Sequence, residues 1–305
     1  MSRGQTPVSQ GAAFAPRGHW CLSPNFPPPI APRRGQTPVS QGAAFAPRGH
    51  WCLSPNLPPP AWTLAFLLLP ALHAQDARQI FQESQNRGRS HSQSFQGVLD
   101  VFAANNKVSR KSWTSVRLGA YGNSKAILRF TEPPDVKGVA LLIVNHPDRS
   151  SDQWMWTPNL GRDRRIALQD RSTRFFGTDF SFEDLEERDA DQFDFKLTGE
   201  EPIDGAPCYR LEARPRERKI SQYTLTRIWI RKDNYVPVQI ESWIQDRPVR
   251  RLHQTDLEKV QNIWTPRTLE MTDLRRNSRT VMRLEKLEYN VPLKDEMFTV
   301  QALRQ

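Results

Sequence analysis

An alternation of apolar and polar residues with a period of two runs through most of residues 94–289, and it constrains the fold more than any other feature. Successive side chains of a β-strand point to opposite faces, so this alternation predicts strands. Turn residues recur about every ten positions, and Asp204-Gly205 is a tight hairpin signal. Short connections between sequential strands predict an antiparallel sheet that must curl. The predicted strands are Ser94–Ala104, Lys111–Leu118, Ala126–Thr131, Val139–Asn145, Gln153–Thr157, Arg164–Leu168, Phe193–Gly199, Cys208–Ala213, Tyr223–Arg231, Val236–Gln245, Val249–Val260, Trp264–Asp273 and Thr280–Tyr289.

The segment before these strands predicts one short helix, Asp76–Gly88. Apolar or small residues follow the helical spacing from Ala77 to Ser84. Asp76 can cap the start, and Gly88 can take the left-handed position just past the end.

Several strands carry large apolar residues on both faces. Trp154 and Trp156 share one face of their strand, whereas Trp229 lies opposite Ile228 and Ile230. Both faces must therefore be covered, one by an outer helix and the other by a cavity that accepts an apolar ligand. The candidate residues of the cavity wall are Trp113, Phe130, Trp154, Trp156, Trp229 and Trp243.

An aromatic segment, Arg174–Leu185, separates the two sets of strands. Ser181 or Asp179 can begin a helix that continues through Glu187. Two interpretations stay open: a plug that closes the sheet, or a movable lid over the cavity. The lid candidates are Phe175, Phe176, Phe180 and Leu185.

The front of the chain differs in composition from the rest. Residues 1–74 contain no Asp or Glu and hold 14 of the 25 prolines, and Arg3–Pro29 recurs almost unchanged at Arg34–Pro60. So little apolar surface predicts a disordered extension over residues 1–60. Residues 61–74 resemble the apolar core and cleavage region of a signal peptide, being too short to span a bilayer. We therefore expect export to the periplasm and one mature β domain over residues 75–305.

Catalytic and metal-binding patterns are missing from the sequence. The mature domain holds only His91, His146 and His253, and no two of them have ligand spacing. Nucleotide-binding, hydrolase and zinc-protease motifs do not occur. The three cysteines do not form a disulfide framework. The sequence therefore predicts a protein that is not an enzyme and needs neither cofactor nor metal.

Basic residues cluster at Arg162–Arg165, Arg214–Lys219, Arg247–Arg251 and Arg275–Arg279. These clusters fall mostly at predicted turns, where solvated charge is common. A weak, transient attraction to anionic lipid headgroups is the alternative. The expected export argues against nucleic acid as a partner.

Three stretches resemble the successive signatures of the outer-membrane lipoprotein-sorting proteins, which belong to the LolA/LolB-like superfamily. They are Asp152-Gln-Trp-Met-Trp-Thr-Pro158, Arg164-Arg-Ile-Ala167 and Phe175-Phe-Gly-Thr-Asp-Phe-Ser-Phe-Glu-Asp-Leu185. The resemblance covers about Ala77–Gln305.

This resemblance implies an unclosed antiparallel β half-barrel wrapped around lid helices. It also implies a periplasmic carrier that shelters the acyl chains of a lipoprotein or other lipid between membranes, sometimes beside an inner-membrane transporter. The alternative is a non-catalytic interaction module of the envelope that docks on such a transporter.

Overall fold

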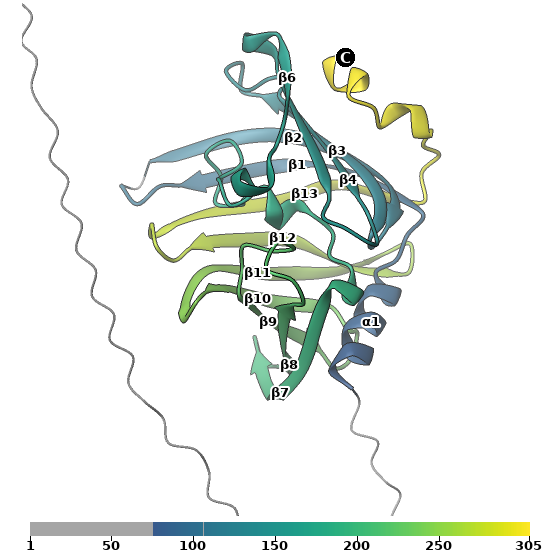
Figure 1. Cartoon of the computed structure of the whole chain (residues 1–305), viewed down its shortest axis with the longest axis vertical. Coiled ribbons are helices and arrows are strands. Elements are labelled where there is room, and N and C mark those ends of the chain that lie inside the picture. The colour runs from purple at the N-terminus through teal and green to yellow at the C-terminus, as the bar shows by residue number, and fades with distance from the viewer. Residues whose placement is uncertain (1–75, 106) are drawn as a thin grey trace, which may run out of the picture. The chain divides into compact units, whose positions relative to one another are not determined.

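The computed structural model describes residues 76–105 and 107–305, in which one α-helix and thirteen strands form the regular structure (Figure 1). The helix α1 spans Ala77–Arg87. The strands are β1 (Ser92–Phe102), β2 (Val108–Ala120), β3 (Asn123–Glu132), β4 (Ala140–Asn145), β5 (Asp152–Thr157), β6 (Arg162–Arg165), β7 (Phe193–Ile203), β8 (Ala206–Pro215), β9 (Leu225–Arg231), β10 (Pro237–Ile244), β11 (Arg247–Val260), β12 (Ile263–Asp273) and β13 (Ser278–Tyr289). Each overlaps one predicted strand. The expectations for residues 1–74 lie outside the described residues.

All thirteen strands belong to a single antiparallel sheet, which confirms the predicted fold class. Their order is β6-β5-β4-β3-β2-β1-β13-β12-β11-β10-β9-β8-β7. Thus β1 pairs with both β2 and β13, and β6 and β7 form the two edges of an unclosed half-barrel. The chain passes from one edge to the other through residues 166–192, which we call the crossing segment. In Figure 1 this teal segment lies in front of the sheet.

The inner face of the sheet is the face that the crossing segment covers. Phe175 and Phe180 of this segment are buried in one cluster with Trp113, Phe130 and other residues of β1–β4, β12 and β13. The ring centroids of Phe130 and Phe175 lie 5.3 Å apart in a stacked arrangement. Burial of these rings holds the segment against the sheet.

The helix α1 covers another part of the inner face. Asp76 caps it by accepting a hydrogen bond from the Arg78 amide at 3.4 Å, and Ile80 is buried against residues of β7–β9. Gly88 follows the helix with φ −87°, so the predicted left-handed conformation is wrong. A Cβ at this position would lie 2.7 Å from the hydroxyl of Tyr121, so a larger residue would require the tyrosine side chain to shift.

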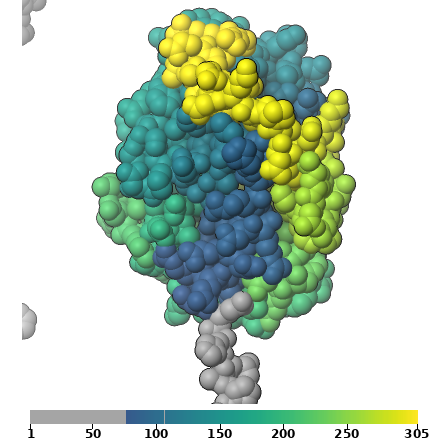
Figure 2. Space-filling model, turned by 90° about the vertical axis from the view of Figure 1, so that its right-hand side faces the viewer, coloured from purple at the N-terminus to yellow at the C-terminus, as the bar shows by residue number. Residues whose placement is uncertain are grey.

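The C-terminal residues 293–305 cover part of the outer face. Phe298 and Leu303 are buried against Ile127, Ala140 and Leu142 of β3 and β4. In Figure 2 these yellow residues lie over the teal end of the domain. The cover on this face is built from short 3₁₀ turns, Asp295–Met297 and Gln301–Arg304, instead of the expected outer helix.

The crossing segment also contains less helix than expected. Only the 3₁₀ turn Glu183–Leu185 forms, where the sequence predicts a helix that continues through Glu187. The N-cap residue of this turn is Phe182, and Ser181 just before it donates its amide to the Asp184 carboxylate at 2.7 Å. Asp179 points its carboxylate at β13 and is not available as a helix cap. Contacts with the sheet therefore replace helical hydrogen bonds.

Candidate functional site

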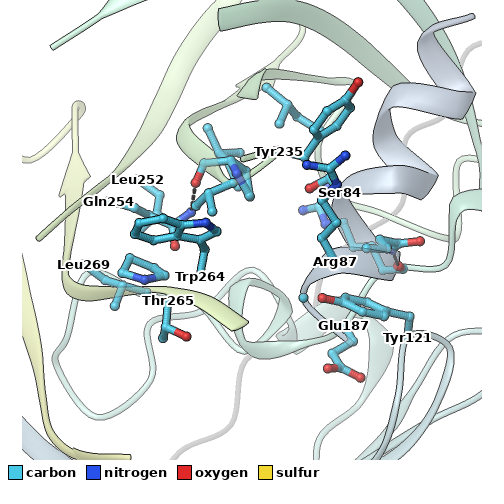
Figure 3. A pocket seen from close by; sticks show the side chains of 18 of the residues that line it. Ser84, Arg87, Tyr121, Glu187, Tyr235, Leu252, Gln254, Trp264, Thr265 and Leu269 are labelled. Carbon is cyan, nitrogen blue, oxygen red and sulfur yellow. Dashed lines mark hydrogen bonds between the residues drawn. The ribbon is translucent and has the colours of Figure 1, made fainter. Parts of the chain in front are cut away.

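A cavity of about 720 Å³ lies between α1, the crossing segment and the inner face of the sheet. Figure 3 shows Ser84 and Arg87 of α1 on one side, with Leu252, Trp264 and Leu269 of β11 and β12 on the other. Its volume is within the range of small-molecule sites in proteins. The helix thus forms one wall, and the strands form the floor.

The register of the sheet divides this floor into a polar row and an apolar row. Thr226, Ser242 and Arg250 are direct neighbours on β9, β10 and β11, and all three are buried. One step further along the same face, the apolar row consists of Ile228, Ile240, Leu252 and Met271. All seven residues line the cavity. A ligand that lies along the strands would meet polar groups at one end and aliphatic groups in the middle.

Trp264 stands at the other end of the cavity, close to the β11–β12 turn. Its side chain is unusually accessible for a tryptophan, with 41% of the residue exposed. Lys259, directly opposite on β11, is also exposed and also lines the cavity. The exposed residues place the opening of the cavity at this end, whereas the end at Arg250 is closed.

Four carboxylates of the crossing segment pair with arginines along the closed side. The ion pairs are Glu183–Arg188 at 3.6 Å, Asp184–Arg250 at 3.6 Å, Glu186–Arg171 at 3.3 Å and Glu187–Arg117 at 3.1 Å. Arg117, Arg171 and Arg250 are themselves buried. A buried charge is strongly destabilising without a partner, so these pairs fix the position of the acidic stretch over the sheet.

Asp179 anchors the crossing segment to β13. Its carboxylate accepts hydrogen bonds from Ser278 at 2.5 Å and Thr280 at 2.7 Å, and it pairs with Arg174 at 2.9 Å. The carbonyl oxygen of Asp179 accepts a further bond from Arg250 at 3.0 Å. Asp179 is fully buried, so each of these bonds forms away from water.

Burial changes the acidity of two groups in the cavity wall. It raises the pKa of Glu186 from 4.5 to about 7, although Arg171 acts in the opposite direction. It also raises the pKa of Tyr121 to about 12, with a contribution from the nearby Glu187 carboxylate. Tyr121 is therefore a neutral hydrogen-bond donor at physiological pH.

None of the ten residues singled out from the sequence lines this cavity. Trp113, Phe130 and the four lid candidates Phe175, Phe176, Phe180 and Leu185 belong to the inner-face cluster. Trp154 and Trp156 lie on the outer face beside the C-terminal residues. Trp229 packs in a separate cluster with Cys208, and its indole donates to Glu201 at 3.0 Å. Trp243 lies under the guanidinium of Arg227. Ligand contact by these residues stays a prediction.

Only some of the residues that form the cavity floor can be predicted from the sequence. Ile228 lies on the face opposite Trp229, so the alternation itself separates the two. The large aromatic residue points away from the cavity, and the smaller aliphatic one lines it. Trp229 and Ile228 therefore lie on opposite faces of β9, and only Ile228 lines this cavity.

The described residues show no arrangement suited to a metal ion, since no three His, Cys, Asp or Glu side chains converge. In the same part of the chain, every helix is too short or too polar to cross a bilayer. The geometry of the cavity supports binding by burial and hydrogen bonding.

The unclosed sheet, with a helix over its inner face and a cavity between them, is a LolA-like fold. The fold resembles an outer membrane lipoprotein-sorting protein domain from Vibrio parahaemolyticus, with a TM-score of 0.71 and 24% identity over 75% of this chain and 98% of that one. A DUF1329 family protein from Desulfovibrio piger gives 0.71 and 27% over 74% and 97%. A LolA superfamily protein from Nitrosomonas europaea gives 0.60 and 19% over 74% and 99%.

Residues 122–305 also match the model of a family described as "Uncharacterized protein", and the chain belongs to this family. No curated protein sequence matches the chain. The structural matches confirm the LolA-like resemblance that the sequence motifs indicate.

Proposed function

We propose that this protein is a non-catalytic periplasmic carrier that binds acyl chains of a lipoprotein or other lipid and moves them between membranes. The observation that carries this proposal is the cavity with its aliphatic floor. The floor residues Leu252, Leu269 and Met271 also belong to the apolar cluster of the inner face, so the cavity opens directly onto the core of the sheet. The Vibrio parahaemolyticus domain is named for lipoprotein sorting, which supports the same class of cargo.

The free energy gained when an acyl chain is buried in the cavity is large enough to support a carrier function. Each CH₂ group removed from water contributes about 0.8 kcal/mol, so a cavity that holds one chain can compete with a membrane. Release then requires open and closed states that differ by only a few kcal/mol. We propose the crossing segment as the lid, because it lies over the inner face of the sheet and its residues Asp184, Glu186 and Glu187 line the cavity.

A substitution that fills the cavity tests this function. Leu269 is half-buried on β12 and lines the cavity, so Leu269→Trp places an indole in the space proposed for the chain. We expect the affinity for a fluorescent fatty acid, measured by titration, to fall at least about tenfold, since several CH₂ contacts are lost.

Thr268→Trp is the matched control. Thr268 is the neighbour of Leu269 on β12 and points to the opposite face, so the same bulk is added outside the cavity. We expect near-normal affinity in this variant. Equal affinity in Leu269→Trp and the wild type, with both folded by circular dichroism, would rule out this cavity as the binding site.

A further inference from the structure

The cavity wall beside α1 contains a tyrosine whose hydroxyl has no hydrogen-bond partner among residues 76–105 and 107–305. Tyr121 lines the cavity, and its hydroxyl makes no hydrogen bond with any residue in the described part of the chain. In Figure 3, Tyr121 and Glu187 lie on the side of α1, across the cavity from Thr265 and Leu269. A polar group in such a position is normally hydrogen-bonded to protein or water. A ligand atom can therefore supply the acceptor.

The backbone at Tyr121 adopts a conformation that is uncommon for a bulky residue. It lies in the two-residue turn between β2 and β3 with φ 31°, followed by Gly122 with φ 78°. Asn, Asp or Gly is favoured at the first position of such a turn, and a bulky residue there is strained. Strain of this kind accumulates at functional sites.

The charges around Tyr121 compensate one another. Arg117 pairs with Glu187 at 3.1 Å and donates to the Gln93 side-chain oxygen at 2.9 Å. The amide nitrogen of Gln93 donates to no described residue, and Gln93 lines the cavity as well. Arg89 lies over the Tyr121 ring at 5.7 Å, and the Glu186 carboxyl belongs to the same wall. The Tyr121 hydroxyl and the Gln93 side-chain amide are therefore two uncharged hydrogen-bond donors beside the Arg117–Glu187 ion pair.

We propose that Tyr121 and Gln93 form a polar subsite that binds the uncharged carbonyl oxygens of an acyl ester or amide, while the attached chain lies on the aliphatic floor. Both donors are uncharged, and the Glu187 carboxylate beside them is already paired with Arg117. This inference rests on the proposed carrier function and names the chemical class of its cargo: acylated molecules with a neutral head, such as a diacylglycerol ester.

The test compares two fluorescent probes, an acyl-labelled diacylglycerol and a pyrene-labelled alkane of similar chain length without a head. In Tyr121→Phe we expect diacylglycerol to bind about fivefold more weakly, as the loss of one hydrogen bond predicts, and the alkane to bind as in the wild type. The melting temperature should not fall, because the deleted hydroxyl has no protein partner. Equal diacylglycerol affinity in Tyr121→Phe and the wild type would overturn the subsite.

Tyr289→Phe is the matched control. Tyr289 also lines the cavity, but its hydroxyl forms a hydrogen bond of 2.6 Å with Thr265. In Tyr289→Phe we expect a lower melting temperature and no selective loss of affinity for diacylglycerol. A selective loss of affinity equal to that of Tyr121→Phe would overturn the assignment to Tyr121. If the wild type binds neither probe, the proposed carrier function is wrong. If the wild type binds both probes and Tyr121→Phe changes neither affinity, only the proposed subsite is wrong.

Discussion

Glu186 places an ionisable group in the cavity wall, where burial shifts its pKa to about 7. Between its ordinary value of 4.5 and about 7, the folded protein holds a proton on this carboxyl that the unfolded chain has already lost. Stability therefore falls as the pH rises through this window. The side-chain amide of Gln153 donates to Glu186 at 2.5 Å, and Arg171 pairs with it, so the charged form is only partly compensated.

Glu186→Gln should remove this pH dependence. The free energy of unfolding of the variant, relative to the wild type, should rise by roughly 1 to 3 kcal/mol between pH 5 and pH 8, since glutamine has no proton to lose. Urea titrations of both proteins at several pH values measure this difference. A difference that is constant over the range would show that Glu186 titrates near its ordinary pKa in the folded protein.

The residues of the site were harder to predict than the strands that hold them. Tyr121, Gln93 and Ser242 are single polar residues in strands or turns, and no motif marks them. Their proximity comes from strand register and from contacts between distant parts of the chain. The size of Trp229 suggested a ligand contact, but its side chain packs with Cys208 in a cluster apart from this cavity, so that contact stays a prediction.

At the scale of elements, the strands were predictable because half-buried strands carry a period-two pattern over many residues. The short edge strand β6 was the least accurate, since Arg162–Arg165 consists of exposed or half-buried polar residues without alternation. The helix predicted to continue from Asp179 or Ser181 through Glu187 is reduced to a 3₁₀ turn, because the signal at Ser181 is local. Hydrogen bonds from Asp179 to β13 decide its conformation, and these join residues about a hundred positions apart.

Asp179→Ala tests the role of this anchor. The substitution leaves Ser278, Thr280 and Arg174 without their shared acceptor in a buried site, so we expect a loss of about 3 kcal/mol in the free energy of unfolding. We also expect faster exchange of a bound fluorescent fatty acid, because the lid is released. Denaturant titration and stopped-flow displacement measure the two effects.

The matched control is Asp170→Ala in the same segment. Asp170 is partly exposed and pairs with Arg164 at the surface, so its loss should cost less than about 1 kcal/mol and leave exchange unchanged. Loss of stability in Asp179→Ala with normal exchange would contradict a lid that opens around this residue.

At the scale of the whole described domain, the fold follows from a meander that starts at the centre of the sheet. The chain runs outward from β1 to β6, crosses to β7 and returns to β13 beside β1. Such an order requires a segment that joins the two edges, and here it passes over the inner face, where it and α1 cover the sheet (Figure 1). The cavity is the space that these two covers and the strands leave between them. The topology thus links the sequence pattern to a site for an acyl chain.

The most direct test of the carrier function is mass spectrometry of organic extracts from the protein. The full chain would be expressed in a bacterial host and purified from the periplasmic fraction without detergent. We predict a co-purifying acylated molecule in stoichiometric amount, with an ester or amide beside its chain. Protein that contains no such molecule, and that also fails to take up a fluorescent fatty acid, would contradict the proposal.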